Sequence, residues 1–497
     1  MDNKDIIISK QEQKIAEQEQ RIAEQEQKIT AQQQQIDTLT STVEELQEVI
    51  RELRRQLNQD SHNSSQPPSK DGFKKVRVES LRKKSGKKVG GQKGHKGNHM
   101  ELPHDPDNVK AHYPEKCQTC PHLAQCLATG SVFKCREKRY EVNAVITTKV
   151  TEHQSMTVCN CLCGEQNLIG SFPENVKAYI QYGDSVTVLA GLLNTYGAVS
   201  AKRIQVLLGT ILGVRLSTGT ICSMVEKCAA QVGDTLKVIQ QKLRESSVVH
   251  FDETGVNVNG KNMWVHSAST STLTYQTFSE KRGQAGINEG GILPDYTGIA
   301  VHDCWSSYWK YDAATHAVCN AHLLRELTGV EQYSPDHKWA TRFKALLLAM
   351  KKAKETTIAR NKQQISPDFW HKCNKEYDQI LALAEEECPL PAAPRQKKKG
   401  RPKKGKERAL IERLQKLKGE VCFFIRDFRV PFDNNQAERD VRNVKTKSKV
   451  SGCFRTHKGT QHYLDIMSFL STGLKHGVNV FKALTSAFTG NASVVLQ

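Results

Sequence analysis

The stretch VVHFDETGVNVNGKNMWVHSA, residues 248–268, indicates how the largest part of the chain folds. It opens with a short apolar run that ends at Asp252, and its later half is divided by Asn-Gly, a dipeptide typical of tight hairpin turns. Residues 273–278 supply a third strand, and further on another apolar run ends in an acid, Asp303. The sequence therefore predicts an α/β core whose sheet contains two buried strands that each end in an aspartate.

Two aspartates at one edge of a sheet indicate a metal site. Carboxylates that meet in a partly buried place repel each other unless a cation lies between them. Mg²⁺ is the cation we expect, because the available ligands are oxygens. A pair of ions needs a third carboxylate from elsewhere in the chain.

The third acid lies in FDNNQAERDVRNVK, residues 432–445. Apolar residues at helical spacing predict a helix that is capped by Asn434 or Asn435 and buries one stripe. Taken alone, the adjacent Glu438 is best explained by an ion pair with Arg442 one turn later, a contact of about 0.2 to 0.5 kcal/mol. Together with the two aspartates, it becomes a candidate metal ligand. The stripe consists of Ala437, Val441 and Val444.

The order of these motifs resembles that of the DDE transposases and, within them, the large transposase subunit of insertion sequence family 66. HFDETG (250–255) is similar to the first-aspartate motif, VHD (301–303) to the second, and NNQAER (434–439) to the glutamate motif. Cys319-Asn-Ala-His322 matches a Cys-x-x-His feature after the second acid. The N-terminal regions of such proteins are matched by residues 64–69, residues 90–97 and a cysteine-containing unit.

The resemblance implies an RNase H-like catalytic domain that cleaves DNA at element ends and joins it to target DNA. Two Mg²⁺ ions would be held by Asp252, Asp303 and Glu438, with Asp252 as the bridging ligand. In such two-metal chemistry one ion activates a water and the other stabilises the leaving oxygen. Cys319 and His322 are accessory candidates, and His322 either contacts the scissile strand or is a buried, hydrogen-bonded histidine.

Several neighbouring charges have expected roles. Arg439, Arg442 and Lys445 would contact DNA phosphates. Glu253 follows Asp252 but alternates to the other strand face, so we expect it to be structural. Two other functions use the same residues: a DNA-binding protein whose acids are structural, and a two-metal nuclease that cuts without joining.

The composition of the chain indicates what kind of molecule it binds. A chain of 497 residues with a formal net charge of +19 has room for two to four domains and favours a polyanion, double-stranded DNA first. It has no apolar run of about 18 residues and no signal-peptide core, so we expect no membrane association and a bacterial cytoplasmic, nucleoid-associated protein. The 15 cysteines indicate reduced thiols and a metal site rather than a disulfide framework. A need for accessory proteins encoded by the same element stays open.

Residues 8–57 carry a strict seven-residue repeat. β-branched residues occupy the first core position from Ile8 to Ile50, and leucines occupy the second in the C-terminal half. This pattern is typical of a parallel coiled-coil dimer, although glutamines weaken the N-terminal half. The alternative is a long helix that folds back on its own chain. We expect a homodimer or higher oligomer.

A basic segment follows the repeat. Residues 60–69 form a polar, proline-bearing linker, and residues 70–98 contain eleven Lys or Arg among glycines that let the backbone approach phosphate. The alternative is a solvated, disordered run, which is compatible with ordering on DNA. The candidate DNA contacts are Lys83, Lys84, Lys87, Lys88, Lys93 and Lys96.

Two groups of cysteines, about forty residues apart, predict a small structural Zn²⁺ module. Residues 142–150, between the groups, are expected to be rich in strand. Free thiols are the alternative. The candidate ligands are Cys117, Cys120, Cys161 and Cys163, with Cys159 as the first substitute.

The remaining segments are mainly helical. Residues 200–228 weakly match a helix-turn-helix, and a plain helical connector is the alternative. The long interval between the second and third acids predicts a helical insertion, at 338–387 and 407–418. Its basic run around Arg401 resembles an AT-hook that reads a narrow minor groove, or is a solvated loop.

These features predict six domains. They are a coiled coil at 1–59, a basic DNA-binding linker at 60–110, a zinc module at 111–170, a helical domain at 171–245, a catalytic domain at 246–478 with an insertion at about 330–425, and a tail at 479–497.

Overall fold

The computed structural model describes residues 3–57, 107–129, 133–142, 146–157, 169–390 and 405–497. The chain divides into two units, residues 75–151 and the remainder. The predicted DNA contacts Lys83, Lys84, Lys87, Lys88, Lys93, Lys96 and Arg401, and the cysteines Cys159, Cys161 and Cys163, lie outside the described residues.

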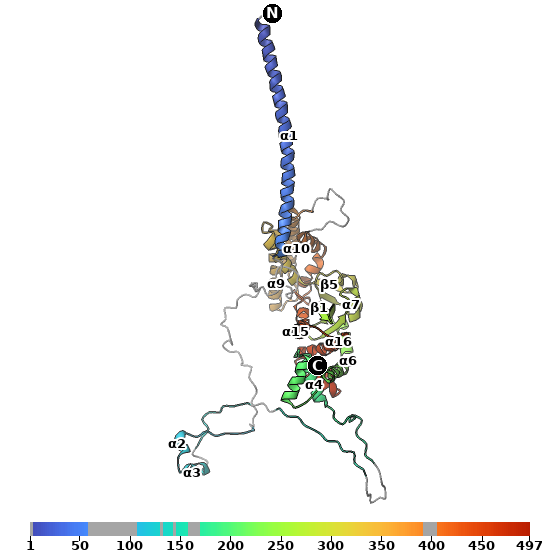
Figure 1. Cartoon of the computed structure of the whole chain (residues 1–497). Coiled ribbons are helices and arrows are strands. Elements are labelled where there is room, and N and C mark those ends of the chain that lie inside the picture. Colours follow the sequence, from blue (N-terminus) through green and yellow to red (C-terminus); the bar gives the residue numbers. More distant parts are fainter. Residues whose placement is uncertain (1–2, 58–106, 130–132, 143–145, 158–168, 391–404) are drawn as a thin grey trace. The chain divides into compact units, whose positions relative to one another are not determined.

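The larger unit is built on a mixed five-stranded sheet, of which β1 and β5 are labelled in Figure 1. The strand order is β3-β2-β1-β4-β5. The first three strands are antiparallel, whereas β4 and β5 run parallel to β1. The turn between β1 and β2 has positive φ at Asn259 (49°) and Gly260 (82°), as a tight Asn-Gly hairpin requires. The predicted hairpin is confirmed. The strands are β1 (Val248–Val258), β2 (Lys261–Ser269), β3 (Thr274–Ser279), β4 (Ile299–His302) and β5 (Thr315–Val318).

The strand register shows that the prediction of an aspartate at the end of each strand is correct for only one of the two. Asp303 directly follows β4, but Asp252 lies within β1 and not at its end. Parallel pairing between β1 and β4 stops at His250 and Val301, while β1 continues because it stays paired with β2 as far as Val258. Asp252 therefore lies where the parallel pairing ends, level with Asp303.

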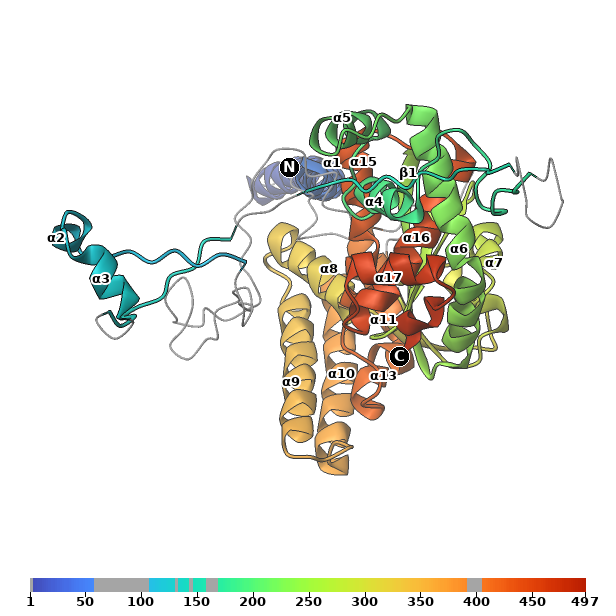
Figure 2. The ribbon, with the colours of Figure 1, turned by 90° about the horizontal axis from the view of Figure 1, so that it is seen from below.

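A helical layer closes the edge of the sheet at β3. Helix α16 (His457–Lys475) packs on β3 together with α6 (Thr218–Glu245), and α17 (Val480–Phe488) packs beside them (Figure 2). The outward backbone N–H groups of β3 donate to side chains of α16, including Thr274 to Thr472 Oγ1 at 3.1 Å and Gln276 to Ser468 Oγ at 2.9 Å. An edge strand without such partners would offer unpaired donors to other chains.

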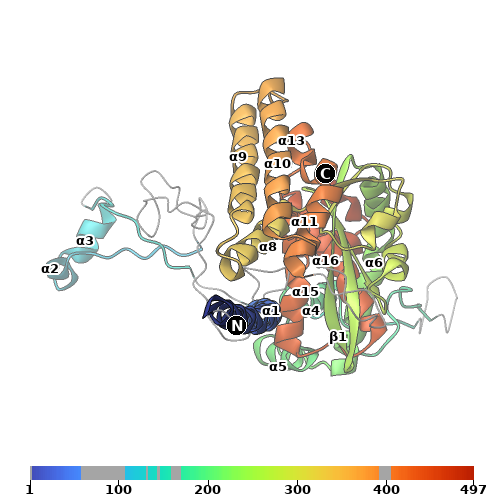
Figure 3. The same ribbon diagram turned by 90° about the horizontal axis from the view of Figure 1, so that it is seen from above.

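A second helical group packs on β4 and β5 through its own apolar core. Its two long helices, α9 (Trp339–Ala359) and α10 (Pro367–Glu387), lie side by side (Figure 3). The helices expected between the second and third acids are thus present. The others in this group are α8 (Asn320–Tyr333), α11 (Lys406–Lys416), α12 (Lys418–Val421) and α13 (Phe423–Arg426).

Before the sheet, α4 (Asp184–Asn194) and α5 (Ala201–Ile211) pack against α6. The turn between α5 and α6 contains Gly213 with φ of 68°. The second helix of the expected helix-turn-helix pair continues far beyond residue 228, to Glu245, and buries its apolar face in the core of the larger unit.

The first helix, α1 (Asn3–Leu57), is continuous. Those of its heptad-repeat side chains whose exposure is described are exposed, from 48 % at Ile50 to 64 % at Leu39. The apolar stripe expected of a coiled coil is therefore uncovered within one chain.

The smaller unit contains α2 (Glu115–Gln118) and α3 (Leu123–Ala128). Its described residues 133–142 and 146–151 form no strand, so the expectation of strand at 142–150 is wrong for the residues seen. The physical reason is exposure: Val142, Ile146 and Val150 are 62 %, 58 % and 90 % exposed, and no core holds them in a ladder.

The segment that carries Glu438 is α14 (Asn435–Asp440), continued by α15 (Arg442–Ser451). The predicted stripe is confirmed, because Ala437, Val441 and Val444 are all buried. Helix α14 packs on β1 and β2, which brings Glu438 to the part of β1 that carries Asp252.

Candidate active site

The three predicted acids come together around β1. Burial raises the pKa of Asp252 well above its usual range, and the negative charges of Glu253, Asp303 and Glu438 raise it further. Burial also raises the pKa of Asp303, as does the charge of Glu253. Acids that raise each other's pKa in this way lie close together in a site from which water is largely excluded.

Asp252 and Asp303 are held by backbone donors. The N–H of Glu253 donates to Asp252 Oδ1 at 2.9 Å, and the N–H of Trp305 donates to Asp303 Oδ1 at 2.9 Å. These bonds fix the orientation of each carboxylate and leave its second oxygen for another ligand.

Glu438 has different neighbours from those that its own helix suggested. Its carboxylate lies 3.8 Å from His322 Nε2 and 3.8 Å from Arg325 Nη2, both on α8. The ion pair with Arg442 is not among its contacts in the described structure. Glu438 Oε1 is buried and has no hydrogen-bond partner among the described residues.

Asn434 joins the segments that carry the site. Its side-chain amide donates to Phe251 O at 2.8 Å, and its Oδ1 lies 2.7 Å from His250 Nδ1. Its backbone N–H donates to Cys319 Sγ at 3.1 Å. Asn434 is the N-cap residue of α14, one of the two predicted, but its side chain makes no cap hydrogen bond. Only its place before Asn435 distinguished Asn434 in the sequence, so the contacts that it makes with β1 were not predicted.

Glu253 is part of the group of acids, whereas strand alternation predicted only a structural role for it on the other face of the strand. Its side chain is only 3 % exposed, pairs with Arg282 Nη2 at 2.8 Å and accepts a hydrogen bond from the Tyr308 hydroxyl. The Arg282 guanidinium lies between two indole rings, 4.8 Å from the centroid of Trp264 and 4.4 Å from that of Trp305. Glu253 is thus a fourth carboxylate beside the two aspartates, held by a stacked arginine.

The three cations expected to bind DNA lie along α14 and α15. Arg439 and Arg442 are exposed, and Arg439 donates to Gln436 Oε1 at 3.0 Å. Lys445 turns toward β1, where its Nζ donates to Gly255 O at 3.2 Å. Burial lowers the pKa of Lys445, and the charge of Asp252 opposes that shift.

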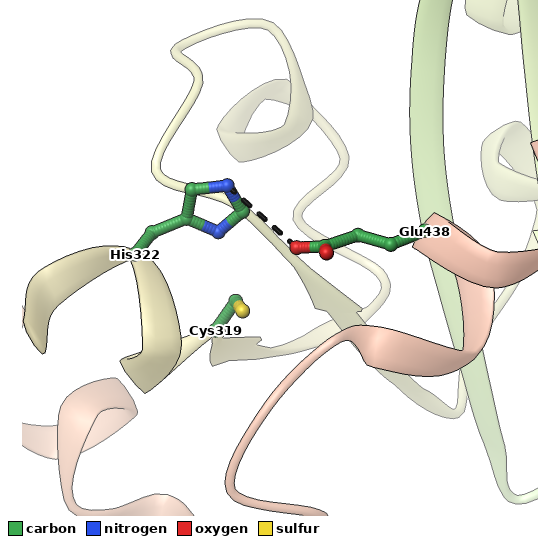
Figure 4. Close-up of side chains that lie close together, drawn as sticks. All are labelled: Cys319, His322 and Glu438. Carbon is green, nitrogen blue, oxygen red and sulfur yellow. Dashed lines mark ion pairs between the residues drawn. The ribbon is translucent and has the colours of Figure 1, made fainter. Parts of the chain in front are cut away.

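Cys319 and His322 lie beside Glu438 (Figure 4). Cys319 is fully buried immediately before α8, and His322 is in the first turn of that helix. Candidate ligand atoms of Cys319, His322 and Glu438 all lie within 4.8 Å of one another. Burial raises the pKa of Cys319 to about 12.

The predicted zinc ligands are only partly described. Cys117 lies in α2 and Cys120 in the turn after it, where the N–H of Cys120 donates to Cys117 O at 3.1 Å. Both are partly buried free thiols, as is Cys126 in α3. Their expected partners Cys161 and Cys163 lie outside the described residues, so the zinc module stays a prediction.

The donor set around Asp252 fits divalent cations. Several carboxylates meet in a largely buried place, and one Glu438 oxygen has no hydrogen bond among the described residues. Oxygen-only donors of this kind match the preference of Mg²⁺. An α/β sheet that gathers such acids is a candidate site for metal-dependent chemistry.

Comparison with known protein families identifies the family of this chain. Residues 184–462 match the Transposase IS66 family, and this match spans more than half of the chain. The protein therefore belongs to the IS66 transposase family, which confirms the resemblance seen in the sequence. Residues 11–101 also match a family of unknown function, DUF6444. No curated protein matches the chain.

None of the described helices combines the length and the apolar character that crossing a bilayer needs.

Proposed function

We propose that the protein binds the ends of an insertion sequence and catalyses Mg²⁺-dependent DNA strand cleavage and strand transfer. Membership of the IS66 transposase family supports transposase function. The observation that carries the catalytic assignment is the convergence of Asp252, Asp303 and Glu438 at one place on an α/β sheet. The same convergence supports an RNase H-like core and a DDE mechanism.

In this proposal the three carboxylates would hold two Mg²⁺ ions, with Asp252 between Asp303 and Glu438. The ions would supply charge neutralisation and an activated water at the phosphodiester. The chain itself keeps the acids in place: backbone N–H groups orient the two aspartates, and Asn434 fixes the start of the helix that carries Glu438. Such fixed orientation is what positions reacting groups.

The surrounding cations would orient DNA. Arg439 and Arg442 are exposed beside Glu438, and Lys445 reaches the strand that carries Asp252. Arginine and lysine in these positions neutralise phosphates on either side of the scissile bond. The basic segment with Lys83 to Lys96, and Arg401, would add contacts along double-stranded DNA.

The proposed assembly is a dimer or higher oligomer formed through α1. The supporting observation is its exposed stripe of isoleucine, valine and leucine at seven-residue spacing. Two linked copies of the protein would hold both ends of an element, and a coiled coil would supply that link.

The catalytic proposal is tested with isosteric neutral variants. Asp252→Asn, Asp303→Asn and Glu438→Gln should each lower Mg²⁺-dependent end cleavage by about 10³-fold or more, while DNA affinity changes little. Asp312→Asn, at an exposed aspartate, is the matched control and should cleave normally. Wild-type cleavage by Glu438→Gln would disprove the assignment.

Joining of precut ends to target DNA separates a transposase from the alternative of a nuclease. A strand-transfer product that disappears in Asp252→Asn supports the transposase. Cleavage without any such product favours the nuclease, and DNA binding without either reaction favours a non-catalytic DNA-binding protein.

A further inference from the structure

We propose that Cys319, His322 and Glu438 form a separate site for a thiophilic divalent cation such as Zn²⁺, and that its occupation withdraws Glu438 from the catalytic carboxylates. The inhibitory part of this inference rests on the proposed function, whereas the binding part does not. The site differs in chemistry from the oxygen-only site because it contains sulfur and nitrogen donors.

The geometry is close to that of a zinc site. The candidate ligand atoms lie within 4.8 Å of one another. Tetrahedral Zn²⁺ bound to sulfur, nitrogen and oxygen places its ligand atoms about 3.3 to 3.8 Å apart, so shifts of roughly 1 Å close the site. Figure 4 shows Cys319 and Glu438 on two sides of the His322 ring.

Two of the candidate donor atoms have no hydrogen-bond partner among the described residues. His322 Nδ1 and Glu438 Oε1 are both buried and have no hydrogen bond among the described residues. Native proteins seldom leave such atoms unsatisfied, and a bound cation would satisfy both. Arg325 approaches the other carboxylate oxygen, Oε2, and therefore does not occupy the oxygen needed for the ion.

Burial raises the pKa of the Cys319 thiol, and two features next to the sulfur favour its thiolate form. Cys319 Sγ accepts the backbone N–H of Asn434 at 3.1 Å, an outer contact of the kind that stabilises a thiolate ligand. Cys319 also precedes the fourteen-residue helix α8, whose N-terminus favours negative charge. On binding, the thiol proton leaves for solvent and the thiolate takes its place as a ligand.

Both the proposed Zn²⁺ site and the proposed Mg²⁺ site use Glu438, so binding at one site affects the other. Glu438 is on α14, which packs on β1, the strand that carries Asp252. A thiolate-bound Zn²⁺ that takes Glu438 Oε1 would hold this carboxylate beside α8, where it already lies near His322 and Arg325, and keep it from a cation at Asp252. Zn²⁺ is then expected to inhibit Mg²⁺-dependent cleavage.

Binding is tested with Co²⁺ on the full-length protein, because Co²⁺–thiolate absorbance reports sulfur ligation directly. Cys319→Ser keeps an acceptor for the Asn434 N–H and should lose one equivalent of bound Co²⁺, or weaken it by about 10-fold or more. Cys373→Ser, at another buried cysteine on α10, is the matched control and should keep that equivalent. Any Co²⁺ bound by the cysteines of the predicted zinc module is the same in both variants, because both keep Cys117, Cys120, Cys161 and Cys163.

His322→Gln provides a second ligand variant if Cys319→Ser folds poorly. It should also lose the equivalent, whereas Asp252→Asn should retain it. Equal Co²⁺ stoichiometry and affinity in the wild type, Cys319→Ser and His322→Gln would overturn the site, whatever the cleavage assay shows.

Inhibition is tested separately by titrating Zn²⁺ into the Mg²⁺-dependent cleavage reaction. Cys319→Ser should need about 10-fold more Zn²⁺ for half inhibition than the wild type or Cys373→Ser. Equal sensitivity of all three would overturn the inhibitory role. Absence of cleavage by the wild type with Mg²⁺ alone would instead refute the proposed function and leave the Co²⁺ result intact.

Discussion

At the residue scale, Asn434 contributes more to the site than its place in the sequence indicates. Phe251 O and His250, which it contacts, lie 183 and 184 residues away along the chain. Because the Asn434 side chain is 2 % exposed, each bond is made in a place where water cannot replace it. Loss of the amide would leave buried polar groups unsatisfied on β1.

Asn434→Ala is therefore expected to destabilise the protein by about 2 to 4 kcal/mol, since each unsatisfied buried group costs roughly 1 to 3 kcal/mol. Urea denaturation measures this change. Asn435→Ala, at the exposed neighbouring asparagine, is the control and should change the free energy of unfolding by less than about 0.5 kcal/mol. Equal effects of the two substitutions would contradict the role assigned to Asn434.

Asp252 is expected to reduce stability in the metal-free protein. Its ordinary pKa is 3.8, and burial beside other acids raises the pKa in the folded state. A raised carboxyl pKa means that the folded state prefers the protonated form. The corresponding stability is present at low pH and is lost as pH rises from about 4 through the raised value.

Asp252→Asn removes this loss of stability with rising pH. The variant should have a higher free energy of unfolding at pH 7 than the metal-free wild type, because it has no carboxylate whose charged form the folded state disfavours. Denaturation at several pH values with a chelator present is the measurement. Asp312→Asn should follow the wild-type profile, and a parallel profile for Asp252→Asn would show that Asp252 carries no such penalty.

At the scale of elements, the joint between β3 and α16 depends on side-chain hydroxyls. Thr472 Oγ1 accepts the N–H of Thr274 and donates to its carbonyl, at 3.1 and 3.3 Å. Both residues are completely buried. Helix α16 therefore replaces the neighbouring strand that an edge strand lacks.

Thr472→Val keeps the shape of the side chain and removes both hydrogen bonds, so it should destabilise the protein by about 1 to 3 kcal/mol. Thr485→Val on α17 is a matched control, because the Thr485 hydroxyl is buried and has no hydrogen bond among the described residues. That control should be neutral or slightly stabilising. Chemical denaturation of both variants makes the comparison, and a neutral Thr472→Val would show that the edge of β3 does not need α16.

The sequence predicted those elements whose signals are local. Asn-Gly located the β1–β2 hairpin, and apolar periodicity located the buried stripe of α14 and α15. It placed Asp252 at a strand end because an apolar run stops there, whereas pairing with β2 carries the strand on. The partners of Glu438 and Glu253 were not predictable, since His322, Arg325 and Arg282 meet them only through tertiary packing.

At the scale of the whole molecule, the exposed stripe of α1 is the feature that a single chain leaves unexplained. Seven-residue spacing holds from Ile8 to Ile50, and every side chain in this series whose exposure is described is about half exposed. A helix this apolar along one line gains free energy when a second helix covers it, and β-branched residues at the first core position favour a parallel dimer.

Charged substitutions in the core positions should therefore dissociate the protein. Ile29→Lys combined with Ile36→Lys places like charges in the interface, and the expected result is a monomer by light scattering at micromolar concentration, where the wild type is a dimer or larger. Gln27→Lys combined with Gln34→Lys adds the same charge on the outer face of the same helix turns and should remain associated. A monomeric wild type, or equal masses for the two double variants, would refute association through α1. If the pairing of element ends depends on this coil, the core variant should also lose strand transfer while each of its chains still binds DNA.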